Sequence, residues 1–145
     1  MGLKYNKMKL FFKLLIFLIF ILNSQYSYSE VFEVEGNELQ KLIDEGVPII
    51  DIRREEEWFS TGIIKNSNLL TFFDKDGKYD LENWMNEFEN IVQKDNPFIL
   101  ICRTGRRTNI VANYLSQEKN YNYVYDAKGG IKLWLSSGKE TVSPK

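Results

Sequence analysis

The segment Phe98-Ile-Leu-Ile-Cys-Arg-Thr-Gly-Arg-Arg-Thr108 decides the fold of this chain. An apolar run ends at the only cysteine, and a glycine and three arginines follow before a helical pattern begins. This order predicts a strand, a tight loop and the N-terminus of a helix. Backbone N–H groups and the helix dipole attract anions there, and with nearby arginines they favour a thiolate over a thiol. Cys102 is therefore a candidate nucleophile. The arginines disfavour the alternative, a buried core cysteine.

Apolar runs elsewhere have the length and spacing of four further strands and of the helices between them. We expect the strands over Val31–Val34 (an edge strand), Val47–Ile52, Asn68–Phe72, Pro97–Ile101 and Tyr123–Tyr125. We expect helices over Asn37–Asp44, from Glu55 to Gly62, over Asp80–Gln93, over Thr108–Gln117 and after Gly129-Gly130. The pattern also predicts Asn37 as an N-cap and Ile110 on the inward face of its helix.

Strands that alternate with helices predict an α/β fold: a mainly parallel central sheet of about five strands, with helices on both faces. In such sheets ligands bind beyond the carboxyl ends of the strands. Asp51, Cys102 and the segment Asp126–Gly130 each lie where an expected strand ends. We therefore expect these residues to meet at one edge of the sheet.

The residue composition excludes several kinds of site. The chain has no histidine and one cysteine, which excludes a Ser-His-Asp triad, a Cys-His dyad, a zinc site of the Cys/His kind and an internal disulfide. We expect neither a metal nor an organic cofactor. Residues 30–145 carry 15 basic and 20 acidic side chains, a net charge of −5, which provides no electrostatic basis for binding nucleic acid.

The N-terminal residues have the pattern of a secretory signal peptide. Lysines at positions 4, 7, 9 and 13 precede or flank a short apolar run, Leu14–Leu22, and small residues stand at positions 27 and 29. We expect cleavage after Ser29, which places one domain, residues 30–145, in the periplasm or outside the cell. The alternative is an uncleaved, outward-facing membrane anchor, in which residues 10–12 extend the apolar run. A lone thiol in an exported protein indicates that Cys102 is kept for its reactivity.

Three stretches of the chain together carry a known pattern. The first, Ile49–Ile64, contains Asp-x-Arg, an acidic-aromatic pair and a glycine. The second, Cys102–Thr108, matches the loop pattern Cys-Arg-x-Gly-x-Arg-[Ser/Thr]. The third, Tyr125–Trp134 with Gly138, is similar to the pattern Gly-Gly-Ile-x-x-Trp-x-x-x-Gly. In this order and spacing they resemble the single-domain rhodanese family of sulfurtransferases. One position departs from the family: Ile63 stands where a histidine is frequent, and this concerns supporting structure, not the nucleophile.

The resemblance implies a sulfurtransferase that acts through Cys102. The thiolate would take a sulfane sulfur from thiosulfate or a similar small anionic donor and pass it, as a persulfide, to a thiol, a protein or cyanide. Backbone amides would hold the persulfide, and they belong to Arg103, Thr104, Gly105, Arg106, Arg107 and Thr108. We expect a monomer that binds no membrane unless the N-terminal segment is uncleaved.

The arginines have separate expected roles. Arg107 either binds the oxygens of the donor or braces the loop. Arg103 is expected to reach back to a carboxylate such as Asp51, and Arg106 stands where the family varies for substrate preference, so it favours an anionic donor. Asp51 and Arg53 are expected to form a supporting pair with a structural more than a catalytic role.

Two alternatives remain beside this function. Cysteine phosphatases place an arginine six positions after the cysteine, whereas here Thr108 stands there and Arg107 comes one position earlier. The shorter loop suits one sulfur better than a phosphate, and Ile101 replaces the histidine that precedes the phosphatase cysteine, so phosphatase or arsenate reductase chemistry is disfavoured. The other alternative is a non-catalytic or sulfur-carrier module that serves a partner protein, although the intact Cys102 argues against an inactive module.

Overall fold

The computed structural model of the protein describes Lys13 and residues 30–145. The predicted signal peptide, apart from Lys13, and its cleavage site lie outside these described residues. Within them, the helices are all too short or too polar to span a membrane.

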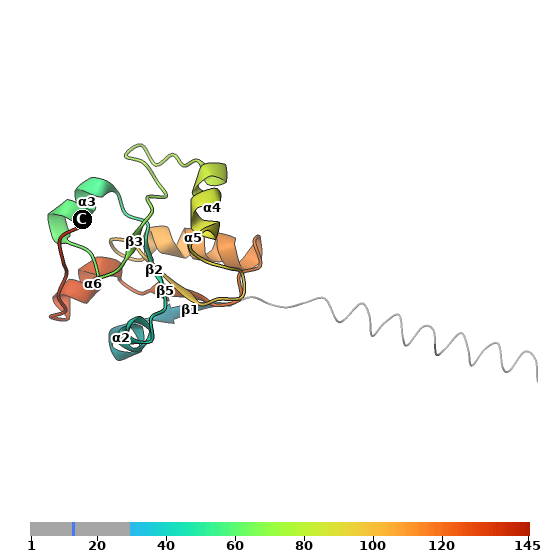
Figure 1. Cartoon of the computed structure of the whole chain (residues 1–145), viewed down its shortest axis with the longest axis horizontal. Coiled ribbons are helices and arrows are strands. Elements are labelled where there is room, and N and C mark those ends of the chain that lie inside the picture. Colours follow the sequence, from blue (N-terminus) through green and yellow to red (C-terminus); the bar gives the residue numbers. More distant parts are fainter. Residues whose placement is uncertain (1–12, 14–29) are drawn as a thin grey trace, which may run out of the picture.

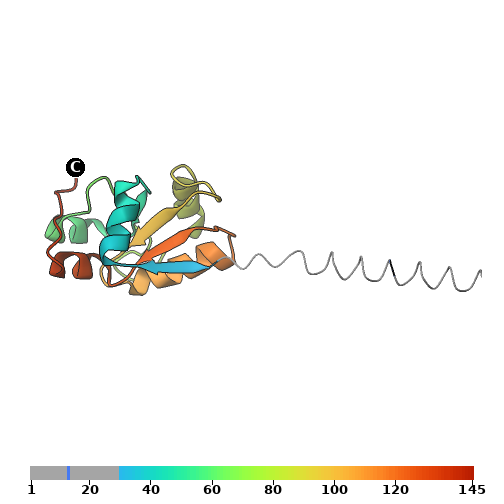
Figure 2. The same cartoon turned by 90° about the horizontal axis from the view of Figure 1, so that it is seen from below.

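A five-stranded parallel sheet forms the centre of the fold, as the sequence predicts (Figure 1). Its strands are β1 (Val31–Val34), β2 (Ile49–Asp51), β3 (Asn68–Leu69), β4 (Phe98–Ile101) and β5 (Val124–Ala127). Their order is β1-β5-β4-β2-β3, and each neighbouring pair is parallel. Figure 2 shows β1, β5 and β4 side by side. β1 lies at the edge as expected, and β4 is central and buried along its whole length.

Residues 30–145 form five helices, one after each strand. They are α2 (Gly36–Asp44), α3 (Glu55–Thr61), α4 (Leu81–Glu89), α5 (Arg106–Gln117) and α6 (Gly130–Ser136). Three predicted helix boundaries are wrong. The N-cap of α2 is Glu35 and not Asn37, because the extended backbone ends at Glu35 and its carbonyl already accepts from the Leu39 N–H. α4 ends at Glu89 and not at Gln93, because the Ile91 N–H donates to the carbonyl three residues back, that of Phe88, and not to the one four residues back. α5 begins at Arg106, two residues before Thr108.

The helices cover both faces of the sheet, as predicted. One core cluster joins the sheet to α4 and α5 through residues such as Trp84, Phe88 and Leu115, and the other joins it to α2 and α6 through Leu39 and Trp134. The prediction that Ile110 points inward is wrong, because its side chain is 57% exposed. Since Thr108, Val111, Ala112 and Leu115 form the buried side of α5, a residue at position 110 falls on the adjoining, exposed side.

Candidate active site

The carboxyl ends of β2, β4 and β5 bring the predicted site residues to one edge of the sheet. Asp51 is the last residue of β2 and pairs in register with Ile101, the residue before Cys102. α6 docks on the same edge, where the Ile131 N–H donates to the Cys102 carbonyl at 2.8 Å and the Lys132 N–H donates to the Arg103 carbonyl at 3.1 Å. The expected meeting of these three segments is therefore confirmed.

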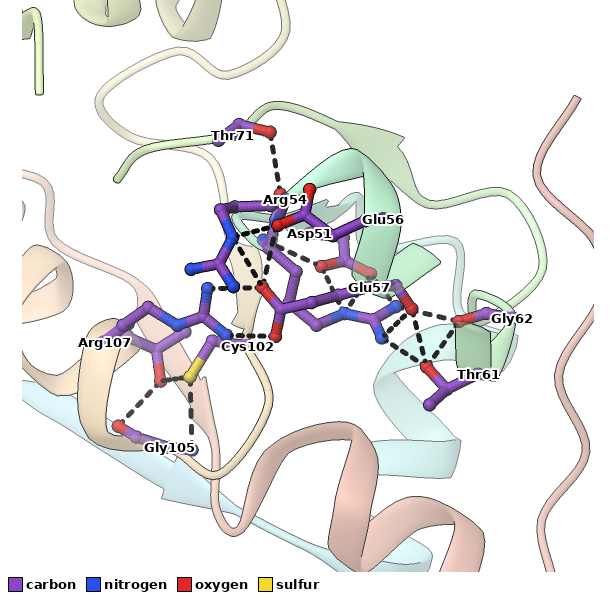
Figure 3. Close-up of polar contacts among 12 residues, drawn as sticks. Asp51, Arg54, Glu56, Glu57, Thr61, Gly62, Thr71, Cys102, Gly105 and Arg107 are labelled. Carbon is purple, nitrogen blue, oxygen red and sulfur yellow. Dashed lines mark hydrogen bonds and ion pairs between the residues drawn. The ribbon is translucent and has the colours of Figure 1, made fainter. Parts of the chain in front are cut away.

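The Cys102 thiol lies buried under the loop that follows β4 (Figure 3). The Gly105 N–H donates to Cys102 Sγ at 3.2 Å, and the Thr108 hydroxyl lies 3.6 Å from the same sulfur. The Thr108 hydroxyl also donates to the Gly105 carbonyl at 3.0 Å, which closes the loop on itself. A backbone N–H aimed at sulfur stabilises a thiolate more than a neutral thiol.

The loop offers more N–H groups than its own hydrogen bonds use. Among the backbone hydrogen bonds of residues 30–145, none is donated by the amides of Arg103, Thr104, Arg106, Arg107 or Thr108. The last three belong to the first turn of α5, where amides have no partner within the helix and the dipole favours negative charge. The loop can therefore bind an anion next to Cys102.

Gly130 lets α6 approach the loop closely enough to hold it. A Cβ atom at this position would stand 2.3 Å from the Cys102 carbonyl oxygen and 2.7 Å from the Arg103 carbonyl carbon. The residue also has a φ of +57°, which side chains other than hydrogen rarely adopt. Any larger residue would displace the backbone from Cys102 to Thr104, directly after the thiol.

Asp51 and Arg53 form a buried pair beneath the site. Arg53 Nη2 lies 2.6 Å from Asp51 Oδ2, and Arg53 Nε donates to both carboxylate oxygens. The remaining Arg53 donors reach the Thr61 hydroxyl at 2.7 Å and the Gly62 carbonyl at 2.9 Å. The structure thus places Arg53 on the carboxylate that Arg103 was expected to reach, and the Arg103 side chain is exposed.

Glu57 is the residue of the site that sequence reasoning missed. Its carboxylate accepts from both terminal nitrogens of Arg107, at 2.6 and 2.7 Å (Figure 3). It also accepts from the Arg54 N–H at 3.1 Å, the capping-box bond of α3. Burial opposes ionisation, but the bonds from Arg107 and Arg54 outweigh it, so the pKa of Glu57 is lowered. A glutamate at the third position of a capping box is a sequence signal, but the N-cap here is Arg54, which the sequence does not mark as a capping residue.

Of the two predicted roles for Arg107, the geometry shows the brace. Its forked contact with Glu57 joins α5 to α3 across 50 residues of sequence. The hydrogen bonds to Glu57 raise the pKa of Arg107, so this guanidinium stays charged.

Asp126 carries a second buried carboxyl near the loop, and none of the ion pairs of residues 30–145 includes it. It lies in β5 opposite Leu100 of β4 and Glu33 of β1, and its side chain is buried. Its Oδ1 has no hydrogen-bond partner. Burial raises the pKa of Asp126 to about 6; a hydrogen bond with Thr108 opposes this rise and the charge of Glu33 adds to it.

A cationic pocket of about 450 Å³ opens beside the loop. Its basic lining residues are Arg54, Lys75, Arg103, Arg106 and Arg107. The one carboxylate in the lining, Asp74, already accepts from the N–H groups of Asp76 and Lys78, both at 2.8 Å. A domain with a net negative charge therefore presents a locally positive site next to its cysteine loop.

The fold and the loop define the class: a parallel α/β domain that holds a cysteine and an anion-binding turn at the carboxyl edge of its sheet. Residues 35–137 match the family model of the rhodanese-like domain, and the chain belongs to this family.

Three similar proteins illustrate the range of the family and the fold. The rhodanese-like domain-containing protein 17 of Arabidopsis thaliana is 25% identical over 131 residues, which cover 85% of this chain and 83% of the plant protein. The polysulfide-sulfur transferase homodimer of Wolinella succinogenes is 17% identical, with a TM-score of 0.61 over 88% of this chain and 90% of that one. A protein of unknown function from Rhodopseudomonas palustris, described as a possible tyrosine phosphatase, is 21% identical, with a TM-score of 0.57 over 77% and 85%. At these identities the two solved structures show the fold alone.

Proposed function

We propose that the protein is a sulfurtransferase that moves a sulfane sulfur from thiosulfate, or a similar anionic donor, to a thiol or cyanide through a persulfide on Cys102. The contact that carries the proposal is the Gly105 N–H on the Cys102 sulfur, at the start of a loop with free amides. Membership of the rhodanese-like family supports the same chemistry.

The reaction needs two displacements at sulfur. In the first, the Cys102 thiolate attacks the outer sulfur of thiosulfate, the S–S bond of the donor breaks, and sulfite leaves with the electron pair. In the second, a thiolate or cyanide attacks the outer sulfur of the persulfide and restores the Cys102 thiolate. The persulfide is an anion, and the amides of the loop are positioned to stabilise it without rearrangement.

The spacing of the loop and its charges support sulfur over phosphate. Arg107, which lies one position too early for a phosphatase, is held by Glu57 in a forked pair. Arg103 and Arg106 remain on the wall of the pocket to attract the donor. Phosphatase and arsenate reductase chemistry therefore stay the less favoured readings.

Mass spectrometry of the intact protein after incubation with thiosulfate tests the proposal. We expect a gain of one sulfur atom on Cys102, and its loss on addition of cyanide with release of thiocyanate. Cys102→Ala should abolish both the adduct and thiosulfate turnover. An unmodified Cys102 at saturating thiosulfate would show that the mechanism is wrong.

The alternative, a module that carries sulfur for a partner or only binds one, makes a different prediction for the same variant. A module that only binds a partner would bind it equally well before and after the Cys102→Ala substitution. Neither the wild type nor this variant would then consume thiosulfate.

We also propose that the domain acts in the periplasm or outside the cell, after cleavage behind Ser29. Basic residues followed by the short apolar run Leu14–Leu22 support this location. N-terminal sequencing of the protein from its native host should begin at Glu30; a chain that retains residues 1–29 in the membrane fraction would indicate the anchored form.

A further inference from the structure

Asp126 is a buried carboxyl that the proposed reaction leaves without a role. The residue is 3% exposed, and its Oδ1 has no hydrogen-bond partner. None of the ion pairs found among residues 30–145 includes it. Because a carboxylate buried without a cation is costly, such a group favours its protonated form. The interior of the domain therefore contains an acid that readily binds a proton.

The strand register places this carboxyl on the same side of the sheet as the thiol. Asp126 pairs with Leu100 of β4, two residues before Cys102. Leu100 and Cys102 belong to the core cluster that α4 and α5 cover, and so does Val124, two residues before Asp126 in β5. Since alternate residues of a strand point to the same face, the Asp126 side chain lies under α5, on the side of the sulfur.

The Thr108 hydroxyl connects the carboxyl to the sulfur. It lies 3.6 Å from Cys102 Sγ and 3.0 Å from the Gly105 carbonyl oxygen, and it also forms a hydrogen bond with the Asp126 side chain. A hydroxyl has a single proton to donate, and here three acceptors surround it. Which of them receives this proton therefore depends on whether Asp126 is ionised.

The other groups that face Asp126 are mostly uncharged. On β1 its partner in register is Glu33, an exposed carboxylate. On β4 it is opposite Leu100, and α5 contributes the Thr108 hydroxyl, whereas the arginines at the start of α5 line the cationic pocket. The titratable groups that face Asp126 from these elements are therefore Glu33 and, beyond the end of β4, the Cys102 thiol.

Two acids joined by one hydroxyl most readily hold one proton between them. A thiolate or persulfide on Cys102 and a carboxylate on Asp126 would be two like charges in a buried site, and each disfavours the ionisation of the other. A neutral Asp126 removes this repulsion and donates to the Thr108 oxygen, which leaves the Thr108 proton for the Gly105 carbonyl or the sulfur. An ionised Asp126 attracts the Thr108 proton instead, because a charged acceptor forms the stronger bond.

We propose that Asp126 is a positioning residue that holds one proton for the site whenever Cys102 is an anion, and that it acts on the sulfur through the Thr108 hydroxyl. This inference rests on the sulfurtransferase function proposed above. When the resting thiol ionises beside an Asp126 carboxylate, its S–H bond breaks, the Thr108 oxygen receives the proton, and Thr108 passes its own proton to Asp126. The thiolate and the persulfide are both single anions, so this proton stays on Asp126 through both displacements.

A titration of the Cys102 thiolate tests the inference without any sulfur donor. The ultraviolet absorbance of the thiolate, with Cys102→Ala as the baseline, gives its fraction at each pH. Asp126→Asn keeps the shape of the side chain and fixes it in a neutral, hydrogen-bonding form. We expect this variant to shift the midpoint of the titration to lower pH by about one unit, which is a tenfold gain in thiolate below the midpoint.

The matched control is Glu33→Gln, which neutralises the carboxylate beside Asp126 in the register but has no hydroxyl between it and the sulfur. Because water screens an exposed charge, its midpoint should move by no more than about 0.3 unit. Equal shifts in Asp126→Asn and Glu33→Gln, or no shift in either, would overturn the inference.

The role of Thr108 is tested by a cycle with Thr108→Val, which removes the hydroxyl. We expect Asp126→Asn to shift the midpoint by less than half as much in the Thr108→Val background as in the wild type. The same shift in both backgrounds would show that Asp126 does not act through Thr108. A full shift without any Cys102 persulfide after thiosulfate would refute the proposed function, whereas persulfide formation with an unshifted midpoint would refute this inference alone.

Discussion

Two pairs of carboxylate and guanidinium groups lie beside the cysteine loop, and they differ mainly in their access to water. In the Asp51–Arg53 pair the side chains are 0% and 1% exposed, and the shortest contact is 2.6 Å. In the Glu57–Arg107 pair they are 12% and 21% exposed, and the shortest contact is again 2.6 Å. The chemistry and the distances are the same, so the surroundings decide what each pair does.

The buried pair stabilises the fold, whereas the pair at the pocket shapes the site. Arg53 satisfies its remaining donors on Thr61 and Gly62, so that β2 is tied to the end of α3. A buried ion pair is tolerated only with such complete bonding. Arg107 instead extends from the first turn of α5, and its pairing leaves Arg103 and Arg106 as the unpaired cations of the loop.

The largest expected effect follows from removing the guanidinium of the buried pair. Arg53→Met would leave the Asp51 carboxylate buried without a cation, and we expect the free energy of unfolding to fall by about 3 to 5 kcal/mol. Urea unfolding followed by circular dichroism at neutral pH measures the change.

The double variant Asp51→Asn/Arg53→Met is the control for this prediction. It removes the uncompensated charge, and we expect it to regain a large part of the stability lost in the single variant. If the double variant were as unstable as the single one, the loss would come from packing or from the Thr61 and Gly62 bonds, and not from the Asp51 charge.

The order of strands and helices was predictable because it depends on local periodicity. The apolar run before Cys102 and the glycines after β5 mark their elements clearly, and the cysteine loop follows from its spacing. The rule that parallel strands end at one edge then placed Asp51 beside Cys102. Helix ends were less predictable: Asn37 is a good capping residue in isolation, but the backbone had already turned at Glu35.

The contacts between distant segments were not predictable in the same way. Glu57 and Arg107 are 50 residues apart, and Glu57 follows two other glutamates of the same charge. Only the three-dimensional structure shows which of the three faces the loop. The Asp51–Arg53 pair, by contrast, was predicted and is confirmed, because Arg53 lies only two residues after Asp51. Arg103, which was also expected to reach this carboxylate, is exposed.

Asp126 differs from Asp51 because its buried carboxyl has no cation beside it among the ion pairs of residues 30–145. The pKa of Asp126 is raised to about 6, from an ordinary 3.8, chiefly by burial. A raised pKa in the folded state means that the neutral acid favours folding below pH 3.8 and that this contribution is lost as the pH rises to about 6. Asp126→Asn should therefore raise the free energy of unfolding at pH 7 by about 1 to 3 kcal/mol.

Urea unfolding of the wild type and of Asp126→Asn at pH 7 and at pH 3.5 measures this effect. We expect the variant to be the more stable protein at pH 7 and the difference to become small at pH 3.5, where Asp126 is neutral in the folded state and mostly neutral in the unfolded state. A gain that did not depend on pH would show that the carboxylate charge is not its cause.

The smallest effect on stability is expected at the half-buried pair, where the effect on turnover should be larger. Glu57→Gln keeps the shape of the side chain but removes the charge that orients Arg107, and we expect a loss of unfolding free energy of about 1 kcal/mol or less. Because the pKa of Glu57 is lowered, this difference should be present above the ordinary value of 4.5 and vanish as the pH falls below it.

We expect the same change to lower kcat/KM for thiosulfate by about tenfold, because a loop that is no longer braced holds its amides less well around the persulfide. Glu56→Gln is the matched control: it lies on the same turn of α3, its carboxylate pairs with Arg54, and its side chain is 65% exposed. Steady-state kinetics with thiosulfate and cyanide distinguish the two variants. Equal turnover in Glu57→Gln and Glu56→Gln would mean that the pair at the pocket, like the buried one, serves only the fold.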